Sequence, residues 1–169
     1  MDSGRRASGL KSELQFGMLS GGIIENERLI YNPGWMVQFC VDKELSKAVD
    51  IGLGVGLQGL EEETILPVFL DIKARTKDRE HSPFLAVNIG GTKGWSSTYR
   101  NLSNFDYEGG FYFSSYYAFD FPINEKMSLL IAMGYIHQNG EIEYSAEGDL
   151  EFEEDFSLDY LTLRAGLRF

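Results

Sequence analysis

The sequence predicts an all-β protein, an eight-stranded antiparallel up-and-down transmembrane β-barrel. Three observations favour this fold: recurring alternation of apolar and polar residues, alternation of short and long connections, and an aromatic residue that ends the last alternating segment. Residues 161–169 show the alternation most clearly, because every odd position is apolar and every even position is polar or glycine. A period of two is the pattern of a β-strand with one apolar face. The segment has nine residues, and a tilted transmembrane strand needs roughly 9 to 11.

Seven further segments repeat this pattern. Residues 49–57 carry Val, Ile or Leu at the odd positions and Asp50 or glycine at the even ones. The other six segments are 14–18, 35–41, 66–72, 85–89, 111–121 and 129–135. Together with the terminal segment they make eight predicted strands.

The predicted connections alternate in length. Segments 42–48, 75–82 and 122–127 are short and polar, and only the short connection at 61–63 interrupts the alternation. The long connections are 20–34, 91–109 and 137–159. Short turns at one end and long loops at the other are typical of outer-membrane barrels. An even number of strands then predicts that both termini lie on the periplasmic side.

Composition is compatible with this fold. No apolar run approaches the roughly 18 residues of a membrane-spanning helix, and a barrel that shows alternate residues to lipid can have the observed mean hydropathy of -0.20. We expect one domain over residues 12–169, preceded by a disordered start or expression remnant over 1–11. That first segment has no apolar stretch, so we expect no signal peptide in this chain. Cys40 is the only cysteine, which excludes an internal disulfide and a cysteine-based zinc site.

A soluble eight-stranded barrel of the lipocalin kind is the main alternative fold. It would turn the apolar faces inward, but a lumen of eight strands is only wide enough for side chains to fill. The aromatic face of 111–121 and seven other apolar faces would overfill it. Gly52, Gly54 and Gly56 would weaken a solvent-facing strand, whereas inside a crowded lumen they leave room for long side chains opposite.

Three stretches also resemble a known family. They are Leu66 to Asp71 (LPVFLD), Ser82 to Phe84 (SPF) and Gly109 to Ser114 (GGFYFS), together with the terminal Phe169. They resemble the small outer-membrane β-barrel proteins of Bacteroidetes-type bacteria, distant relatives of the OmpA and OmpX barrels. The resemblance implies a place in the bacterial outer membrane and recognition of the last strand by the barrel-insertion machinery. The residues expected to form this insertion signal and the aromatic girdle are Phe169, Leu167, Trp35 and Tyr135.

Charged residues occur on the polar faces of the predicted strands. If the apolar faces contact lipid, these charges lie in a narrow lumen, where an unpaired charge would cost several kcal/mol. We therefore expect a paired network that plugs the lumen and prevents general porin activity. Its expected members are Asp50, Asp71, Lys73, Asp120, Arg164 and Arg168.

The last two strands invert their polarity partway along. The odd-numbered positions are apolar up to Tyr135 and polar after it. On the final strand the odd-numbered positions are polar before Leu161 and apolar from Leu161 onward. A hairpin that turns near Glu147 would pair Tyr135 with Asp159. We therefore expect a hairpin over about 137–159 that projects beyond the membrane, with apolar residues inward and acids outward. In this register Glu143 opposes Glu151 and Glu141 opposes Glu153, and the hairpin is either a solvated loop or an edge for strand addition.

The function expected from these features is a structural or surface-interaction role, including adhesion, rather than catalysis. The net charge of -11 argues against a nucleic-acid partner. We expect no cofactor and no metal. Expected partners are outer-membrane lipid, including lipopolysaccharide, and a protein at the extracellular loops. His137 and Glu141 are similar to part of the His, Ser and Glu set of lipid A deacylases, but Asn139 stands where the serine is needed. A narrow channel, a soluble small-molecule binder and a lipid-modifying enzyme remain the alternatives.

Overall fold

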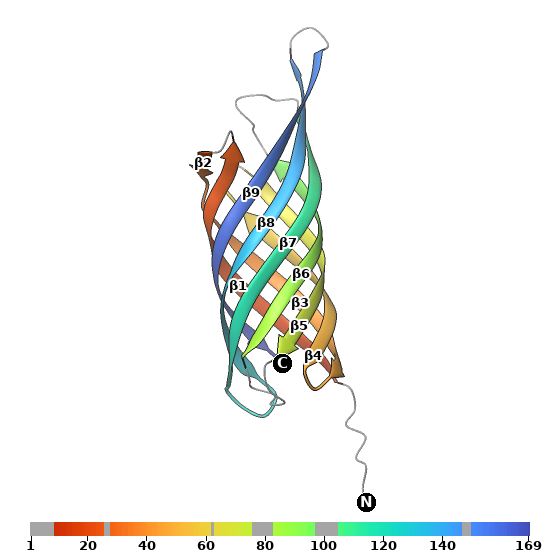
Figure 1. Ribbon diagram of the computed structural model, residues 1–169, viewed down its shortest axis with the longest axis vertical. Coiled ribbons are helices and arrows are strands. Elements are labelled where there is room, and N and C mark those ends of the chain that lie inside the picture. Colours follow the sequence, from red (N-terminus) through yellow and green to blue (C-terminus); the bar gives the residue numbers. More distant parts are fainter. Residues whose placement is uncertain (1–8, 26–27, 62, 76–82, 97–104, 147–149) are drawn as a thin grey trace, which may run out of the picture.

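In the computed structural model, eight long antiparallel strands form one closed barrel, and a short ninth strand pairs at its rim (Figure 1). The structure describes residues 9–25, 28–61, 63–75, 83–96, 105–146 and 150–169, without the side chains of 25, 96, 105–108, 142–146 and 150–154. The long strands are β1 (Leu10–Glu25), β3 (Gly34–Ser46), β4 (Val49–Gly59), β5 (Glu63–Arg75), β6 (Phe84–Ser96), β7 (Phe105–Pro122), β8 (Ser128–Ala146) and β9 (Leu150–Arg168). Pairing of β1 with β9 closes the barrel. The predicted fold class is confirmed.

The strands are longer than the alternating segments that predicted them. β1 begins at Leu10, so residues 10 and 11 belong to the first strand and not to a disordered start; residues 1–8 lie outside the described part. Much of the predicted long connection 20–34 is also strand, because β1 continues to Glu25 and pairs there with β2 (Arg28–Tyr31). These extensions lie outside the clearly alternating segments, and the backbone pairing continues through them.

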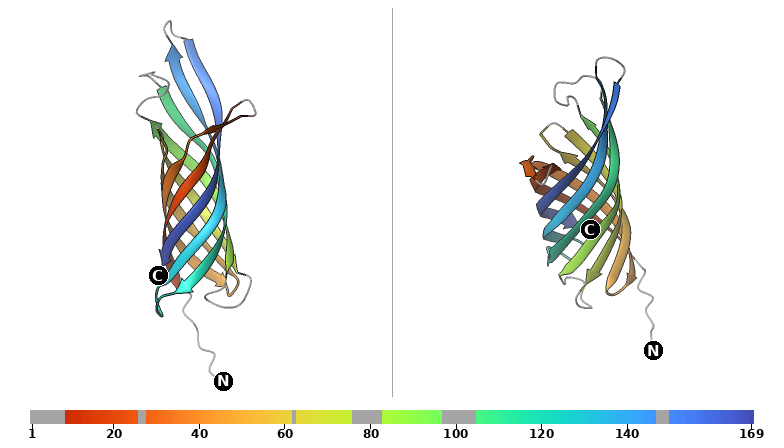
Figure 2. Two further views of the ribbon diagram at one scale, coloured as in Figure 1. Left: turned by 90° about the vertical axis from the view of Figure 1, so that its left-hand side faces the viewer. Right: turned by 45° about the horizontal axis from the view of Figure 1, so that its top comes forward.

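The two ends of the barrel differ. β1 begins and β9 ends at the lower end in Figure 1, where the backbones of Ser12 and Phe169 exchange two hydrogen bonds of 2.7 and 2.9 Å. The turns at 47–48 and 123–127 lie at the same end. At the opposite end, β7, β8 and β9 extend well beyond the other strands (Figure 2). No helix in the described ranges has the length and hydropathy to cross a bilayer.

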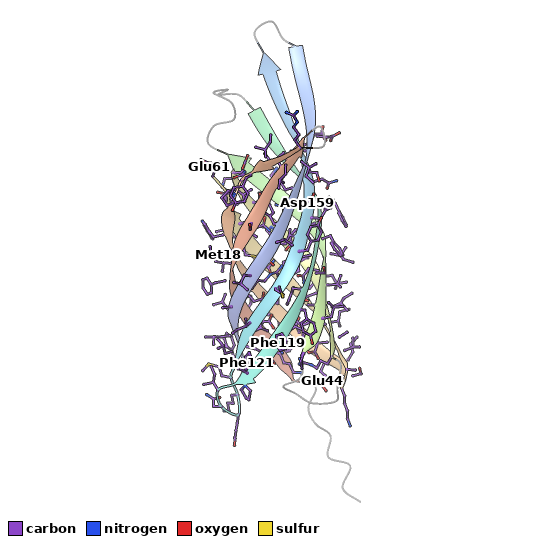
Figure 3. The ribbon with its side chains drawn as sticks, turned by 60° about the vertical axis from the view of Figure 1, so that its left-hand side comes forward. Met18, Glu44, Glu61, Phe119, Phe121 and Asp159 are labelled. Carbon is purple, nitrogen blue, oxygen red and sulfur yellow. The ribbon has the colours of Figure 1, made fainter. Side chains whose placement is uncertain are left out.

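Apolar side chains cover the outside of the barrel. On β9, Leu161 and Leu163 are 68% and 61% exposed, whereas the alternate residues Thr162 and Arg164 are buried. Met18 of β1 projects from the outer edge of the wall in Figure 3. This arrangement is the reverse of the one expected for a soluble lipocalin-like barrel, in which apolar side chains would fill the lumen.

The lumen has an apolar upper part and a charged lower part. The upper part is a cluster of buried side chains: Leu19, Met36, Cys40, Ile65, Phe69, Tyr112, Ile136, Leu158 and Tyr160. Gly54 makes this packing possible, because a Cβ there would collide with the ring of Phe69 and with Cys40 Sγ. A Cβ on Gly52 would likewise collide with the carboxylate of Asp42. Both glycines leave room for longer side chains, as the sequence indicated.

The register of the last hairpin differs from the predicted one by two residues. Tyr135 opposes Leu161, and His137 opposes Asp159. The predicted pairs of Glu143 with Glu151 and Glu141 with Glu153 are therefore wrong: Glu143 opposes Glu153, and Glu141 opposes Asp155. A shift of two residues keeps every side chain on its face, so alternation alone could not detect it. The predicted turn at 147–149 lies outside the described residues.

Three strands, rather than two, extend beyond the rim. Phe105 to Gly109 of β7 pair with Gly140 to Tyr144 of β8, while the pairs between β6 and β7 end at Gly91 and Phe111. On the other side, the pairs between β1 and β9 end at Ile24 and Ser157. We call residues 105–110, 139–146 and 150–157 the projecting sheet; it stands above the barrel in Figures 1 and 2.

Candidate functional site

Lys73 is the centre of the charged lower lumen. Its side chain comes from β5, and its Nζ lies 3.1 Å from Glu13 Oε2 on β1, 2.5 Å from Asp42 Oδ2 on β3 and 3.0 Å from Asp71 Oδ2 two residues away. All four side chains are almost fully buried. One ammonium group therefore links carboxylates from three strands.

Arg168 extends this network across the barrel seam. Its Nη2 lies 2.6 Å from Glu13 Oε2, and its Nη1 lies 2.6 Å from Asp120 Oδ2 on β7. The guanidinium also stacks over the ring of Phe84, 4.5 Å from the centroid. Glu13 is thus shared by Lys73 and Arg168, which joins the first and last strands through their side chains as well as their backbones.

A second ion pair lies near the lower opening. Arg75 Nη2 is 2.8 Å from Asp50 Oδ2, and Lys11 Nζ is 3.6 Å from Asp50 Oδ1. Lys11 also contacts the partly exposed Glu44 at 3.2 Å. A small cavity of about 180 Å³ opens here beside Arg75, Asp120 and Arg168. Water can reach the lower edge of the network through it.

Arg164 has neutral partners instead of acids. It donates to Gln38 Oε1 at 3.0 Å, to Ser114 Oγ at 2.7 Å and to Thr162 Oγ1 at 3.0 Å. Its guanidinium lies 4.4 Å from the ring centroid of Tyr116. Arg164 occupies the boundary between the charged and apolar parts of the lumen, where hydrogen bonds and a cation–π contact replace an ion pair.

All six residues expected to line the lumen are buried. They do not form the expected single network: Lys73 and Arg168 share one group of acids, Asp50 pairs with Arg75, and Arg164 has neutral partners. Sequence reasoning missed Glu13, Asp42 and Arg75. Each has the inward parity of its strand and lies one to three residues outside the alternating segment that was assigned. If each predicted strand had been extended as far as the alternation of inward and outward positions continues, these three residues would have been included.

Several buried acceptor oxygens in the lower lumen have no hydrogen-bond donor among the described residues: Gln15 Oε1, Asp42 Oδ1, Asn88 Oδ1 and Asp120 Oδ1. Asp71 Oδ2 has the close Lys73 Nζ but poor hydrogen-bond geometry. Buried carboxylate and amide oxygens are ordinarily satisfied.

A polar row marks the outside of the barrel below the projecting sheet. Asp159 Oδ1 lies 2.9 Å from His137 Nδ1 and accepts a hydrogen bond from the Tyr135 hydroxyl. Asp159 is labelled at this height in Figure 3. The histidine thus contacts Asp159, which the sequence did not single out as its partner. Asn139 Oδ1 accepts a 2.9 Å hydrogen bond from the Phe111 N–H, so it secures the backbone of β7.

The girdle and hairpin residues lie at separate heights. Trp35 is 48% exposed at the upper end of β3, against Gly59, and Tyr135 is exposed beside Asp159. Leu167 and Phe169 are exposed at the lower end of β9. Of the predicted hairpin acids, Glu141 has a described side chain, whereas those of Glu143, Glu151 and Glu153 lie outside the described part.

No protein-family model matches the chain, and no curated protein matches its sequence. The solved structures that share its fold include three outer-membrane proteins. The outer membrane protein AlkL, solved in DMPC lipid bilayers, is 14% identical with a TM-score of 0.69, covering 100% of this chain and 92% of its own. OprG from Pseudomonas aeruginosa is 14% identical with a TM-score of 0.64, covering 95% of both chains. Neisserial surface protein A (NspA) is 8% identical with a TM-score of 0.64, covering 95% and 96%.

The chain has the fold of small outer-membrane β-barrels. At these identities the likeness concerns the fold alone. The finer resemblance to OmpA, OmpX or Bacteroidetes proteins stays a prediction.

Proposed function

We propose that this chain is an integral protein of a bacterial outer membrane, with a lumen closed to solutes and a surface role carried by its outer end. The observation that carries the proposal is a belt of exposed apolar side chains around a barrel whose charges are buried. In water such a belt would be a very large exposed apolar surface. In a bilayer it is the lipid-facing surface that a transmembrane barrel requires.

The belt includes side chains from all eight long strands. Its members include Phe16, Met18, Phe39, Leu53, Val55, Val68, Leu70, Leu85, Ile89, Phe119, Ile131, Met133, Leu161 and Leu163. Its outer limit is the row of Tyr135, His137 and Asp159, beyond which the outward parity of β8 and β9 becomes polar. The barrel end that joins Ser12 to Phe169 is then periplasmic.

Closure of the lumen is supported by the contacts inside it. Lys73, Arg168 and their carboxylates occupy the lower part, and the apolar cluster around Phe69, Tyr112 and Leu158 occupies the upper part. A solute would have to break buried ion pairs and then cross a packed apolar layer. Both steps are costly in a low-dielectric interior.

Among the described residues, the projecting sheet extends furthest from the barrel (Figures 1 and 2). We propose that it serves a structural or surface-contact function, including adhesion to a protein partner. Outer-membrane lipid, including lipopolysaccharide, contacts the belt. The barrel-insertion machinery recognises β9 through its alternating apolar residues and Phe169. Catalysis is not part of the proposal, because Asn139 stands where a lipid A deacylase needs its serine, and its Oδ1 accepts a hydrogen bond from the Phe111 N–H.

Membrane placement is tested by refolding the chain into detergent micelles and comparing its mobility on a gel before and after heating. A folded transmembrane barrel migrates as a compact species that shifts on heating. A monomeric chain that is fully folded in detergent-free buffer would contradict the proposal.

Closure is tested by conductance in planar bilayers. The expected result is no large stable channel at neutral pH. The lower cavity beside Arg75 and Asp120 favours the alternative of a narrow channel, and small, stable, ion-selective steps would establish it in place of a closed lumen.

A further inference from the structure

β2 leaves the barrel wall at the upper rim. As far as Leu19, one edge of β1 pairs with β3, and from Gly22 to Glu25 the same edge pairs with β2 instead. Among the described strands none pairs with the other edge of β2, which ends the order of strands in the sheet. Figures 1 and 2 show this short hairpin at the margin of the upper rim. We call Gly22–Glu25 of β1 together with Arg28–Tyr31 of β2 the rim hairpin.

The rim hairpin exposes apolar side chains on both of its faces. Leu29, Ile30 and Tyr31 are 58%, 48% and 62% exposed. Leu29 opposes Ile24, which is also exposed, and Tyr31 shares this face because it lies two residues from Leu29. An antiparallel sheet in water ordinarily packs one face on a core. The hairpin therefore needs an apolar surrounding that the described residues do not supply.

Hydrogen bonds hold the base of the rim hairpin. The Asn32 N–H donates to Gly21 O at 2.9 Å. Asn32 Oδ1 accepts a 3.2 Å hydrogen bond from the Glu61 N–H on the β4–β5 connection. Gly22 lets β2 approach closely, because a Cβ there would lie 1.9 Å from Ile30 O. The exposed side chains therefore belong to a paired segment that is fixed to the rim.

The strand register shows that the apolar surface continues further out on β1 and β2 than on β8 and β9. Two neighbouring cross-strand rows run from β2 through β1 and β9 to β8: Tyr31, Gly22, Asp159 and His137 in the first, and Leu29, Ile24, Ser157 and Asn139 in the second. In both rows the β2 residue is apolar or aromatic, whereas the β8 residue is polar. The outer limit marked by Asp159 therefore holds for the last two strands but not for the rim hairpin.

The rim hairpin is continuous with the apolar belt. Met18 of β1 opposes Trp35 of β3, and both side chains are exposed. From this pair the outward face of β1 leads through Ser20 to Gly22, which opposes Tyr31. Tyrosine and tryptophan are enriched where a bilayer meets water. The belt and the hairpin therefore form one outward surface that ends in aromatic side chains.

A lipid layer fits this surface better than a second copy of the chain. A stable protein interface takes about 20 to 30 residues a side, whereas the rim hairpin exposes only a few apolar side chains. Its charged residues are confined to the tip, where Glu25, Glu27 and Arg28 stand close together in the sequence. Elements that lie at a membrane surface likewise combine an apolar part in the acyl boundary with a charged part in water.

We propose that the rim hairpin binds lipid of the outer leaflet, with Ile24, Leu29 and Tyr31 in the layer where headgroups meet acyl chains. Lipid contact then extends further out at β1 and β2 than at β8 and β9. The inference rests on the proposed membrane location and adds a lipid contact beyond the polar row that limits the belt.

Depth-dependent quenching of single tryptophans tests this contact. In a background with Trp35→Phe and Trp95→Phe, Leu29→Trp reports on the rim hairpin, Val68→Trp on the middle of the belt and Asp155→Trp on the projecting sheet. Each variant is refolded into phosphatidylcholine vesicles whose lipids carry bromine either near the headgroup or deep in the acyl chain. Leu29→Trp is expected to lose emission mainly to the shallow bromine, Val68→Trp mainly to the deep bromine, and Asp155→Trp to neither.

Heat-modifiable mobility verifies that each variant is folded, and Tyr31→Trp should behave like Leu29→Trp, so the result does not depend on one substitution. Quenching of Val68→Trp with no more quenching of Leu29→Trp than of Asp155→Trp would overturn the inference and leave the membrane location standing. Absence of quenching in Val68→Trp as well would contradict the membrane location itself. A blue-shifted but unquenched Leu29→Trp in a dimeric protein would assign the surface to a second copy of the chain and also overturn the inference.

Discussion

Asp159 of β9 stands directly opposite His137 of β8, with its Oδ1 2.9 Å from the histidine Nδ1. One residue pair below on the same outward face, Tyr135 opposes the exposed Leu161. Above it, Asn139 opposes Ser157. The change from apolar to polar therefore occurs at the same height on both strands. This pair fixes both the register of the hairpin and the outer limit of the apolar belt.

The register can be tested by cross-linking. In a Cys40→Ala background, the double variant His137→Cys with Asp159→Cys should form a disulfide on mild oxidation, because opposed residues of antiparallel strands have Cα atoms within bonding range. The double variant Tyr135→Cys with Asp159→Cys represents the register expected from the sequence and should remain largely reduced. Thiol labelling after oxidation measures both. Preferential cross-linking of the second pair would refute the observed register.

Lys73 should be essential for stability. Lys73→Met removes the ammonium shared by Glu13, Asp42 and Asp71 and leaves buried carboxylates uncompensated, which is expected to cost about 3 to 5 kcal/mol. Lys43→Met, on the exposed side of β3, is the control and should change stability by less than about 0.5 kcal/mol. Urea unfolding in micelles gives both values. Equal stability of the two variants would show that the buried network contributes nothing.

The stability cost of a charge on the apolar belt should depend on how deep in the membrane the charge lies. Leu163→Arg places a charge on the outer face within the belt and should destabilise the bilayer-embedded barrel by about 2 to 4 kcal/mol. Leu161→Arg, next to the boundary marked by Asp159, should cost clearly less, because an arginine there can reach the headgroups. Denaturant unfolding in lipid vesicles measures the difference. If Leu161→Arg were the more costly of the two, the boundary would have to lie further out.

Gly54 should not tolerate even one extra carbon. Gly54→Ala puts a Cβ against the ring of Phe69, inside a closely packed lumen, and overpacking of this kind costs about 1 to 3 kcal/mol. Adding Phe69→Leu should recover part of the loss. Gly91→Ala is the matched control, because its Cβ would meet only Gly110 O at 3.5 Å. A similar loss in Gly91→Ala would attribute the effect to the strand backbone instead of the lumen.

The sequence determined which side of each strand faces outward. Alternation alone assigned Leu163 and Arg164 to opposite faces, and the structure confirms this, since Leu163 is exposed and Arg164 is buried. The reason is that successive side chains of a strand point to opposite sides. The inverted polarity near Tyr135 and Leu161 likewise located the end of the apolar belt. These features depend on neighbours along the chain, so they can be read from the chain.

The tertiary structure decided which residues meet across strands. Glu13 lies 155 residues from Arg168 in the sequence, yet the two form an ion pair at the seam. Lys73 forms ion pairs with Glu13 and Asp42 because barrel closure and the strand register place these side chains of β1, β3 and β5 at the same height in the lumen. Parity is unchanged by a shift of two residues, so alternation along the chain predicted neither the Asp159–His137 pair nor the three-stranded projecting sheet. Those depend on the register of the strands and on barrel closure, which arise from the packing of the whole chain.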